Sequence, residues 1–270
     1  MIVLVCNIYL EVNLMNKIIS KAKELLPLIM LFFALVLIFV PLPILLIQVL
    51  LVLDTAFSLC LFLSKFFNST AIAYHFPRLV IYNSIYTCGI AIATTRTFLS
   101  IENLNDHIPL VLNIGRWICR DNYVCGFFTT LLFSSAILMY CHLHVQKCQE
   151  LAARFCLDMM NQKLFDIDRQ VEQKQITIEE GEIEKRKVQL DIDYHSSMDG
   201  SSKFLEGAVA ALAVLFVIAT GGGVAVGILD MNLFWKDSLN QYIMLSSGYL
   251  VLFVVPLFLT SLSFKINKLE

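Results

Sequence analysis

Long apolar stretches separated by short polar segments dominate the chain. Runs with at most one charged residue cover residues 25–40, 44–64, 123–145, 204–229 and 240–263. A helix that crosses the apolar slab of a bilayer needs about 20 mostly apolar residues, so each run predicts one span. Residues 77–98 form a sixth run that also contains Arg78, Asn83, Thr87 and Arg96. The pattern predicts an all-α, polytopic helical membrane protein with about six spans.

Two segments break the apolar pattern and define the predicted organisation. Val40–Pro43 (VPLP) places two prolines in four residues, which predicts a tight hairpin or a sharp kink between the first two spans. Residues 146–203 hold nine basic and twelve acidic residues, which is half the charge of the protein. The predicted regions are an N-terminal cytoplasmic extension (1–24), a four-span region (25–145), the charged block (146–203), a two-span region (204–264) and a cytoplasmic tail (265–270).

The charged block predicts helices that project into the cytoplasm between the fourth and fifth spans. Residues 146–164 place apolar side chains along one helical face, and residues 170–193 are rich in strong helix formers. Asp166 and Asp168, which lie between these segments, suit a cap or a turn. The alternative is a solvated loop that only keeps the two neighbouring spans apart.

Composition and charge agree with a membrane protein. Of all residues, 58% are hydrophobic and 16% charged, the mean hydropathy is +0.73, and the net charge of −2 gives no basic excess for binding nucleic acid. Lys17, Lys21 and Lys23 place the N-terminus in the cytoplasm by the positive-inside rule, and six crossings return the C-terminus to the same side. Under this topology sixteen of the twenty Lys and Arg residues lie in or beside cytoplasmic segments.

Candidate chemistry in the sequence is sparse. Cys119 and Cys125 share the outward loop or its edge and are placed for a local disulfide, although packing as small apolar residues is the favoured interpretation. Cys141, His144 and Cys148 share a helical face, but without a second ligand cluster we predict no metal site and no cofactor. The sequence contains no H-E-x-x-H or G-x-S-x-G motif, so we do not expect an enzyme.

A series of short matches links the charged block to one protein family. Residues 150–160 (ELAARFCLDMM) match the pattern E-V-A-A-R-F-x-L-D-x-M, and residues 197–204 (SMDGSSKF) match A-M-D-G-A-x-K-F. Further matches lie at Val40–Pro43, Phe76–Pro77 and Ala93–Arg96. By these motifs the chain resembles the FHIPEP family, the export-gate proteins of flagella and type III secretion systems, over about residues 25–263.

The resemblance implies a function in protein export. It implies a homo-oligomeric ring in the bacterial inner membrane, with the lipid bilayer, other export-apparatus membrane proteins and secreted protein substrates as partners. It also implies a part in coupling the proton-motive force to export. Ionisable groups in or beside the membrane are suited to that task.

Two pairs of oppositely charged residues, each four positions apart, are candidates for proton coupling or another export function. Asp199 corresponds to the family's proton-responsive carboxylate, and it can pair with Lys203 on the first turn of the fifth span. Without the resemblance, a carboxylate that meets the dipole of a helix start is the preferred interpretation. Arg154 and Asp158 have the same spacing and match positions linked to export. The alternative for this second pair is a surface ion pair worth less than about 1 kcal/mol.

Arg96 lies inside the third predicted span and needs an anionic partner or a route to the interface. An arginine at the centre of a span costs about 2.5–3.5 kcal/mol on insertion scales. Asp54, in the second predicted span, is the nearest candidate of opposite charge. We therefore expect an Asp54–Arg96 ion pair.

Several features of the family are absent from the sequence. Position 87 is Thr where the family has an arginine, and residues 204–208 (FLEGA) replace F-V-K-G-D, which inverts one charge and removes another. The family continues past the position of Glu270 with two further spans and a large cytoplasmic substrate-docking domain, so we expect a truncated export gate. Two alternatives stay open: an autonomous ion channel or small-solute transporter, and a non-functional remnant of an export gate.

Overall fold

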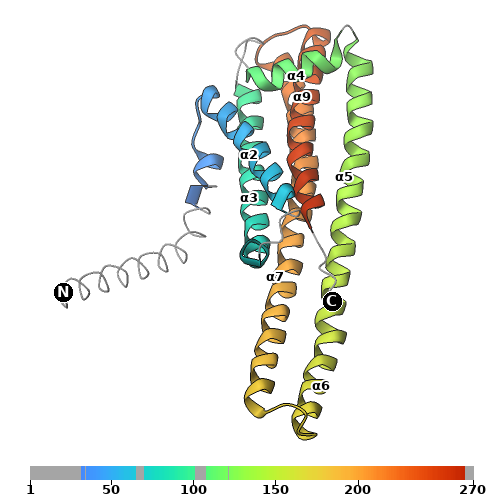
Figure 1. Ribbon diagram of the computed structural model, residues 1–270. Helices are drawn as coiled ribbons and strands as arrows, with labels where there is room; N and C mark the ends of the chain where they lie inside the picture. Colours follow the sequence, from blue (N-terminus) through green and yellow to red (C-terminus); the bar gives the residue numbers. More distant parts are fainter. Residues whose placement is uncertain (1–31, 34, 65–69, 101–107, 121, 265–270) are drawn as a thin grey trace, which may run out of the picture.

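The computed structural model describes residues 32–264 except 34, 65–69, 101–107 and 121, and every regular element in this part of the chain is a helix (Figure 1). The elements are α2 (Ile44–Ser64), α3 (Thr70–Ser100), α4 (Pro109–Cys119), α5 (Tyr123–Arg154), η2 (Phe155–Met159), α6 (Met160–Glu172), α7 (Ile178–Val217), η3 (Ile218–Gly222), α8 (Gly223–Leu229) and α9 (Trp235–Ser263). The elements η2 and η3 are single π-helical turns. The predicted all-α fold is confirmed.

Four continuous helical stretches are long and apolar enough to cross a membrane. They are Ile44–Ser64, Tyr123–Glu172, Ile178–Leu229 and Trp235–Ser263, and they contain the second, fourth, fifth and sixth predicted spans. The third predicted span, 77–98, forms most of α3. Because α3 contains many polar side chains, it is not apolar enough to count among the helices that could cross a membrane. The first predicted span, 25–40, lies largely outside the described residues. The predicted count of six spans is therefore not confirmed.

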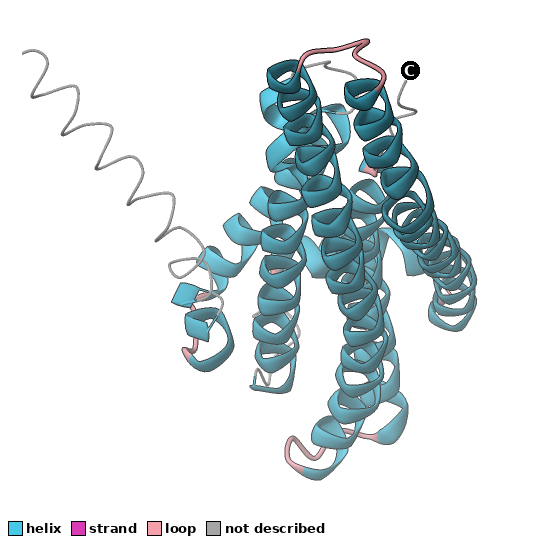
Figure 2. Ribbon diagram, turned by 90° about the horizontal axis from the view of Figure 1, so that it is seen from below, coloured by secondary structure: helices cyan, strands magenta, loops and turns pink. Residues whose placement is uncertain are grey.

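Helix α9 occupies the centre of the bundle. It packs against α2, α4, α5 and α8, and three of its large side chains, Tyr242, Tyr249 and Phe253, are fully buried. Figure 2 shows the helices of the bundle from below, with short loops between some of them. A helix that is buried on all sides needs no polar face. This explains why the amphipathic pattern of a surface helix is missing from residues 240–263.

Close backbone contact fixes α4 on α9. A Cβ atom added to Gly115 would clash with the backbone carbonyl of Met244, and one added to Gly248 would clash with the carbonyl of Val111. Glycine therefore lets the two helix backbones approach each other at both points. This contact anchors the segment between α3 and α5 on the central helix.

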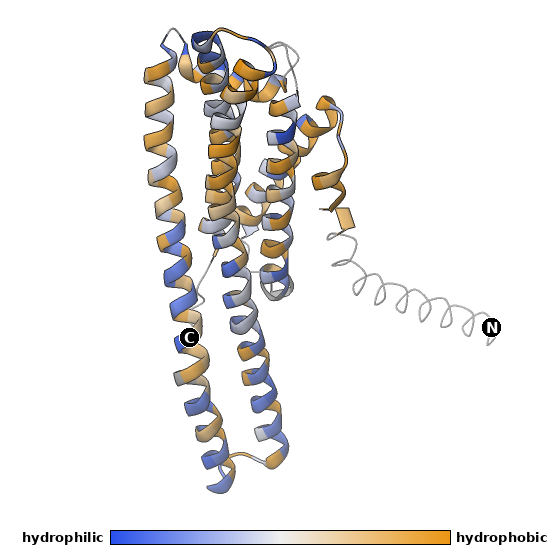
Figure 3. Cartoon of the chain, turned by 180° about the vertical axis from the view of Figure 1, so that it is seen from behind, coloured by the Kyte–Doolittle hydropathy of each residue, from blue (hydrophilic) through white to orange (hydrophobic). Residues whose placement is uncertain are grey.

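Two helical rods extend well beyond the rest of the bundle. The α5–η2–α6 rod has 50 residues and the α7–η3–α8 rod has 52. At 1.5 Å per residue each is about 75 Å long, whereas the apolar slab of a bilayer is about 30 Å thick. Their far ends form an antiparallel hairpin closed by residues 173–177 (Figure 1). In Figure 3, hydrophilic residues alternate with hydrophobic ones along this hairpin, whereas most residues of the bundle are hydrophobic.

Two predicted boundaries in this hairpin are wrong. Asp166 and Asp168 lie inside α6 and not in a turn, and the predicted helix 170–193 is interrupted at 173–177. Helix α7 starts at a capping box, in which the Glu180 amide donates to Thr177 Oγ1 at 3.3 Å and the Thr177 amide donates to the Glu180 carboxylate at 2.9 Å. These reciprocal bonds satisfy amides that the first helical turn leaves unpaired, which is why a helix starts here.

Candidate functional site

Asp199 and Lys203 form the predicted ion pair on α7, where the hairpin meets the bundle. The Lys203 ammonium donates to Asp199 Oδ2 at 2.7 Å, and the two side chains are 64% and 31% exposed, respectively. The pair lies in the middle of α7 and not on the first turn of a helix, so the helix-start interpretation of Asp199 is wrong. Proton binding to Asp199 would leave the Lys203 ammonium without its counter-charge.

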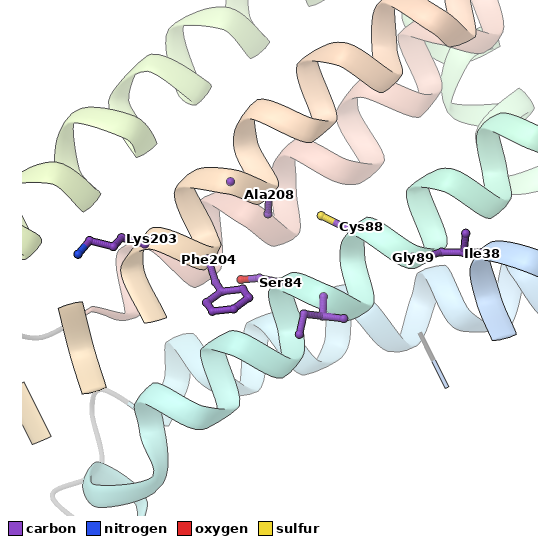
Figure 4. A pocket seen from close by; sticks show the side chains of 9 residues that line it. Ile38, Ser84, Cys88, Gly89, Lys203, Phe204 and Ala208 are labelled. Carbon is purple, nitrogen blue, oxygen red and sulfur yellow. The ribbon is translucent and has the colours of Figure 1, made fainter. Parts of the chain in front are cut away.

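A cavity of about 410 Å³ lies beside this pair (Figure 4). It is lined mainly by apolar and small side chains of α3 and α7, among them Ser84, Gly89, Phe204 and Ala208, and Lys203 stands at one end. In Figure 4 the Lys203 ammonium points away from the other lining side chains. The ion pair thus sits at the rim of an apolar hollow between two helices.

A second polar contact joins α5 to α7 one turn further along. Glu206 lies 3.2 Å from His142 Nδ1 and accepts a hydrogen bond from Gln149 Nε2 at 3.3 Å. In the sequence, Glu206 stands out only as an inverted charge, and nothing there predicts these partners. Spacing within one helix cannot reveal a contact between residues from two helices far apart in the sequence. The acidic side chain thus ties the two rods together where they leave the bundle.

The predicted partner of Arg154 is not tested by the structure. The Arg154 guanidinium donates to Glu150, four residues earlier, at 2.5 Å. Asp158 lies in η2, and the structure does not describe its side chain. Both side chains of the observed pair are more than half exposed, which limits its contribution to stability to less than about 1 kcal/mol.

His195 and Phe155 pack the base of the hairpin. Their ring centroids are 4.0 Å apart, and Lys163 lies over the Phe155 ring. Burial lowers the pKa of His195, the negative charge of Asp191 opposes this shift, and the positive charge of Lys163 adds to it. Burial also raises the pKa of the Cys156 thiol in η2, and the charge of Asp199 raises it further. The π-turn and the Asp199 ion pair therefore lie close enough to interact electrostatically.

The expected Asp54–Arg96 ion pair is wrong. Arg96 donates from Nη1 to the backbone carbonyl of Phe39 at 2.8 Å, and Asp54 Oδ1 accepts from Thr87 Oγ1 at 2.7 Å. Arg96 is nine residues beyond Thr87 on α3, which places it about 13 Å further along the helix axis. Asp54 therefore contacts α3 at Thr87, too far along the helix from Arg96 to form an ion pair with it.

Arg96 caps the helical segment that precedes the proline turn. Phe39 ends this segment, and a helix leaves its last carbonyls without intrahelical donors. An arginine at that end satisfies a carbonyl and also interacts favourably with the helix dipole. The same side chain lines a cavity of about 290 Å³ together with Val40–Pro43.

The structure also describes the cysteines that the sequence singles out. Cys119 and Cys125 are both free thiols, and Cys119 contacts Ser247 Oγ at 3.7 Å. Across the described part of the chain, no group of three or more His, Cys, Asp or Glu side chains could hold a metal ion. Cys141 instead contacts Ser261 of α9 at 3.3 Å, in agreement with a packing role.

Comparison with known proteins gives matches that cover nearly the whole described region. The FHIPEP family matches residues 34–266. The chain is 25% identical over 223 residues to the flagellar biosynthesis protein FlhA of Bacillus subtilis (82% of this chain, 32% of the relative). It is also 25% identical over 256 residues to the hypersensitivity response secretion protein HrpI of Pseudomonas syringae (93% and 36%).

A third relative is the low calcium response locus protein D of Yersinia pestis, 23% identical over 247 residues (91% of this chain, 34% of the relative). The chain spans about a third of the length of the curated relatives it matches. No solved structure matches the chain.

Proposed function

This chain belongs to the FHIPEP family, and we propose that it works in the bacterial inner membrane as part of a flagellar or type III protein export apparatus. The match over residues 34–266 carries the proposal, because it includes the complete hairpin and all four helices that can cross a membrane. Relatives named for flagellar biosynthesis and for secretion support it. The proposal concerns only the third of their length that this chain spans.

In this proposal the hairpin faces the cytoplasm, and both chain termini lie on the same side. The support is the concentration of Lys and Arg in residues 146–203, which the positive-inside rule assigns to that side. Copies of the chain form a ring with other export-apparatus membrane proteins, and secreted proteins pass the gate that they build. The chain acts by binding and gating and has no enzymatic role.

We assign the response to protons to Asp199 and Lys203. Asp199 is only partly exposed, and its partner Lys203 lines a cavity beside α3 of the bundle, so protons can reach Asp199 from the side on which the hairpin projects. Protonation removes the carboxylate charge and releases the ammonium at the rim of the apolar cavity. Release of Lys203 from Asp199 would therefore change both the charge and the packing at the base of the hairpin. Arg154 and Asp158 are proposed to support this step from the neighbouring rod.

The test replaces Asp199 by Asn and by Glu in a strain whose secretion depends on this protein. We expect Asp199→Asn to reduce the amount of secreted substrate at least tenfold, because the amide cannot change its charge, and Asp199→Glu to retain part of the export. Asp193→Asn is the matched control, since this exposed carboxylate of α7 contacts only Gln189 in the described structure. Unchanged export in both Asp199 variants would remove this residue from any role in proton response.

A further inference from the structure

Five polar side chains meet in the apolar interior of the bundle, at the contact of α2, α3 and α9. They are Asp54 and Ser58 of α2, Asn83 and Thr87 of α3, and Thr260 of α9, and none is more than 2% exposed. Asp54 stands at the middle of α2. Burying ionisable or polar groups in the middle of a membrane-crossing helix costs free energy, and in membrane proteins such groups mark functional positions. We call these five residues the polar seam.

Hydrogen bonds connect most of the polar seam. Thr87 Oγ1 donates to Asp54 Oδ1 at 2.7 Å, and Asn83 Nδ2 donates to Thr260 Oγ1 at 2.8 Å and to Ser58 Oγ at 3.0 Å. Asn83 and Thr87 are four residues apart and so face the same side of α3, as Asp54 and Ser58 do on α2. The two helices thus present matched polar faces to each other.

Two oxygen atoms in the polar seam are left without a donor. Asp54 Oδ2 and Asn83 Oδ1 are both buried and have no hydrogen-bond partner in the structure. Leaving a buried acceptor unpaired costs about 1–3 kcal/mol, and more when the group is charged. An ionised carboxylate in this position is stable only if a positive charge neutralises it.

The described residues supply no such positive charge. No Lys, Arg or His among them forms an ion pair with Asp54, and Arg96 is held by Phe39. Tyr86 and Cys88 of α3 are titratable groups close enough to Asp54 to be affected by its charge. A phenol and a thiol are neutral or negative in every protonation state, so neither can balance the carboxylate.

The geometry points to a binding site for one monovalent cation from solution, a proton or a sodium ion, with Asp54 as its anionic ligand in the polar seam. A proton would neutralise Oδ2 directly. A sodium ion is a hard cation that prefers carboxylate, carbonyl and hydroxyl oxygens, and the seam offers all three. The inference does not rest on the proposed export function, because the site is defined by α2, α3 and α9 and can be measured on the isolated protein.

The experiment measures the thermal unfolding midpoint of the full chain in detergent micelles, from pH 5 to pH 9, with sodium chloride or choline chloride. A site that holds a proton keeps it in the folded chain, while the unfolded chain releases it once the pH exceeds the usual range of an aspartate. Over the pH range in which the folded chain keeps this proton, the midpoint therefore falls by about 3 °C for each pH unit, whichever salt is present. Asp54→Asn removes this slope, because the amide is neutral at every pH.

The two cations give different results at high pH. If sodium is the ligand, sodium chloride raises the wild-type midpoint at pH 9 relative to choline chloride, and Asp54→Asn abolishes the difference. Thr95→Val is the matched control: it removes a buried hydroxyl of α3 that contacts Tyr249, outside the polar seam, and should leave the pH and sodium responses intact. Wild-type and Asp54→Asn midpoints that respond identically to pH and to sodium would overturn the inference.

A second variant keeps the test decisive if Asp54→Asn does not fold. Thr87→Lys places an ammonium beside Asp54 and supplies the missing positive charge from the chain itself. We expect this variant to lose the pH and sodium responses as Asp54→Asn does. Responses to pH and sodium that persist unchanged in Thr87→Lys would contradict a cation site at Asp54, and so would a wild-type midpoint that is constant across all conditions.

Discussion

Two charged side chains in the bundle, Arg96 and Asp54, have uncharged partners. Arg96 binds the last carbonyl of a helical segment, and Asp54 binds the hydroxyl of Thr87. Neither partner can be found by searching the sequence for opposite charges, because one is a backbone atom and the other a neutral side chain. The ion pair of Asp199 and Lys203 was predictable, since residues four apart in one helix are neighbours whatever the rest of the fold does.

The contact between α4 and α9 depends on single glycines, and we predict that Gly248→Ala lowers the free energy of unfolding by about 1–3 kcal/mol. The added methyl group would meet the backbone carbonyl of Val111, which cannot move without shifting α4. Thermal unfolding of the purified chain measures the effect.

Gly200→Ala is the control for this substitution. Gly200 lies inside α7, and no atom approaches within 4 Å of the position of an added Cβ. Alanine there should be neutral or stabilising by up to about 1 kcal/mol, because it favours the helix. Equal effects of the two substitutions would show that the α4–α9 contact tolerates a side chain.

At the scale of elements, the start of α7 depends on the Thr177 capping box. Hydrogen bonds from the Thr177 amide and hydroxyl stabilise the Glu180 carboxylate and lower its pKa. A carboxyl with a lowered pKa stabilises the folded state above the pKa of the unfolded chain, and this contribution is lost as the pH falls through the folded value. The hairpin turn is therefore weakest in acid.

We predict that Thr177→Ala increases amide hydrogen exchange in the first turn of α7 about fivefold at neutral pH. The side chain loses the oxygen that accepts the Glu180 amide, so this turn opens more often. Hydrogen exchange followed by mass spectrometry on residues 178–182 measures the change. Thr177→Ser retains the oxygen and should exchange at the wild-type rate. An unchanged rate in Thr177→Ala would mean that turn residues 173–176, and not the Thr177 cap, fix the start of the helix.

The elements show how far sequence reasoning reaches. Apolar runs located the helices, since membrane-crossing segments are long and uniform. The spacing of Thr177 and Glu180 also marks a helix start in the sequence, whereas the predicted cap or turn at Asp166 and Asp168 lies inside α6. The π-turns η2 and η3 could not be predicted, because a single π-helical turn leaves no periodic signal of its own in the sequence.

At the scale of the whole molecule, the two loops at the ends of the α7–η3–α8 rod lie far apart. The hairpin turn at 173–177 precedes the rod and residues 230–234 follow it, separated by 52 helical residues. A rod of this length that crosses a bilayer once must place its two ends on opposite sides. The charges of the hairpin favour the cytoplasm for the first of these loops.

We predict that alkaline phosphatase inserted after Asn232 is active in intact bacteria, and that the same enzyme inserted after Lys174 is inactive. The phosphatase folds only outside the cytoplasm, so its activity reports the side on which each loop lies. Green fluorescent protein inserted at the same positions is the control and should show the reverse pattern. Phosphatase activity at Lys174 would invert the proposed topology and place Asp199 on the other side of the membrane.

The length of the hairpin has a mechanical consequence. From Asp199 to the start of α7 at Ile178 the rod extends about 30 Å, so a tilt of about 5° at its base moves the tip by about 3 Å. The base holds the Asp199 ion pair, the Glu206 bridge and the π-turn η2, all within the same few helical turns. A small rotation at this base is therefore enlarged at the tip of the hairpin. Under the proposed proton response of Asp199, a change of one charge at the base would move the far end of the hairpin most.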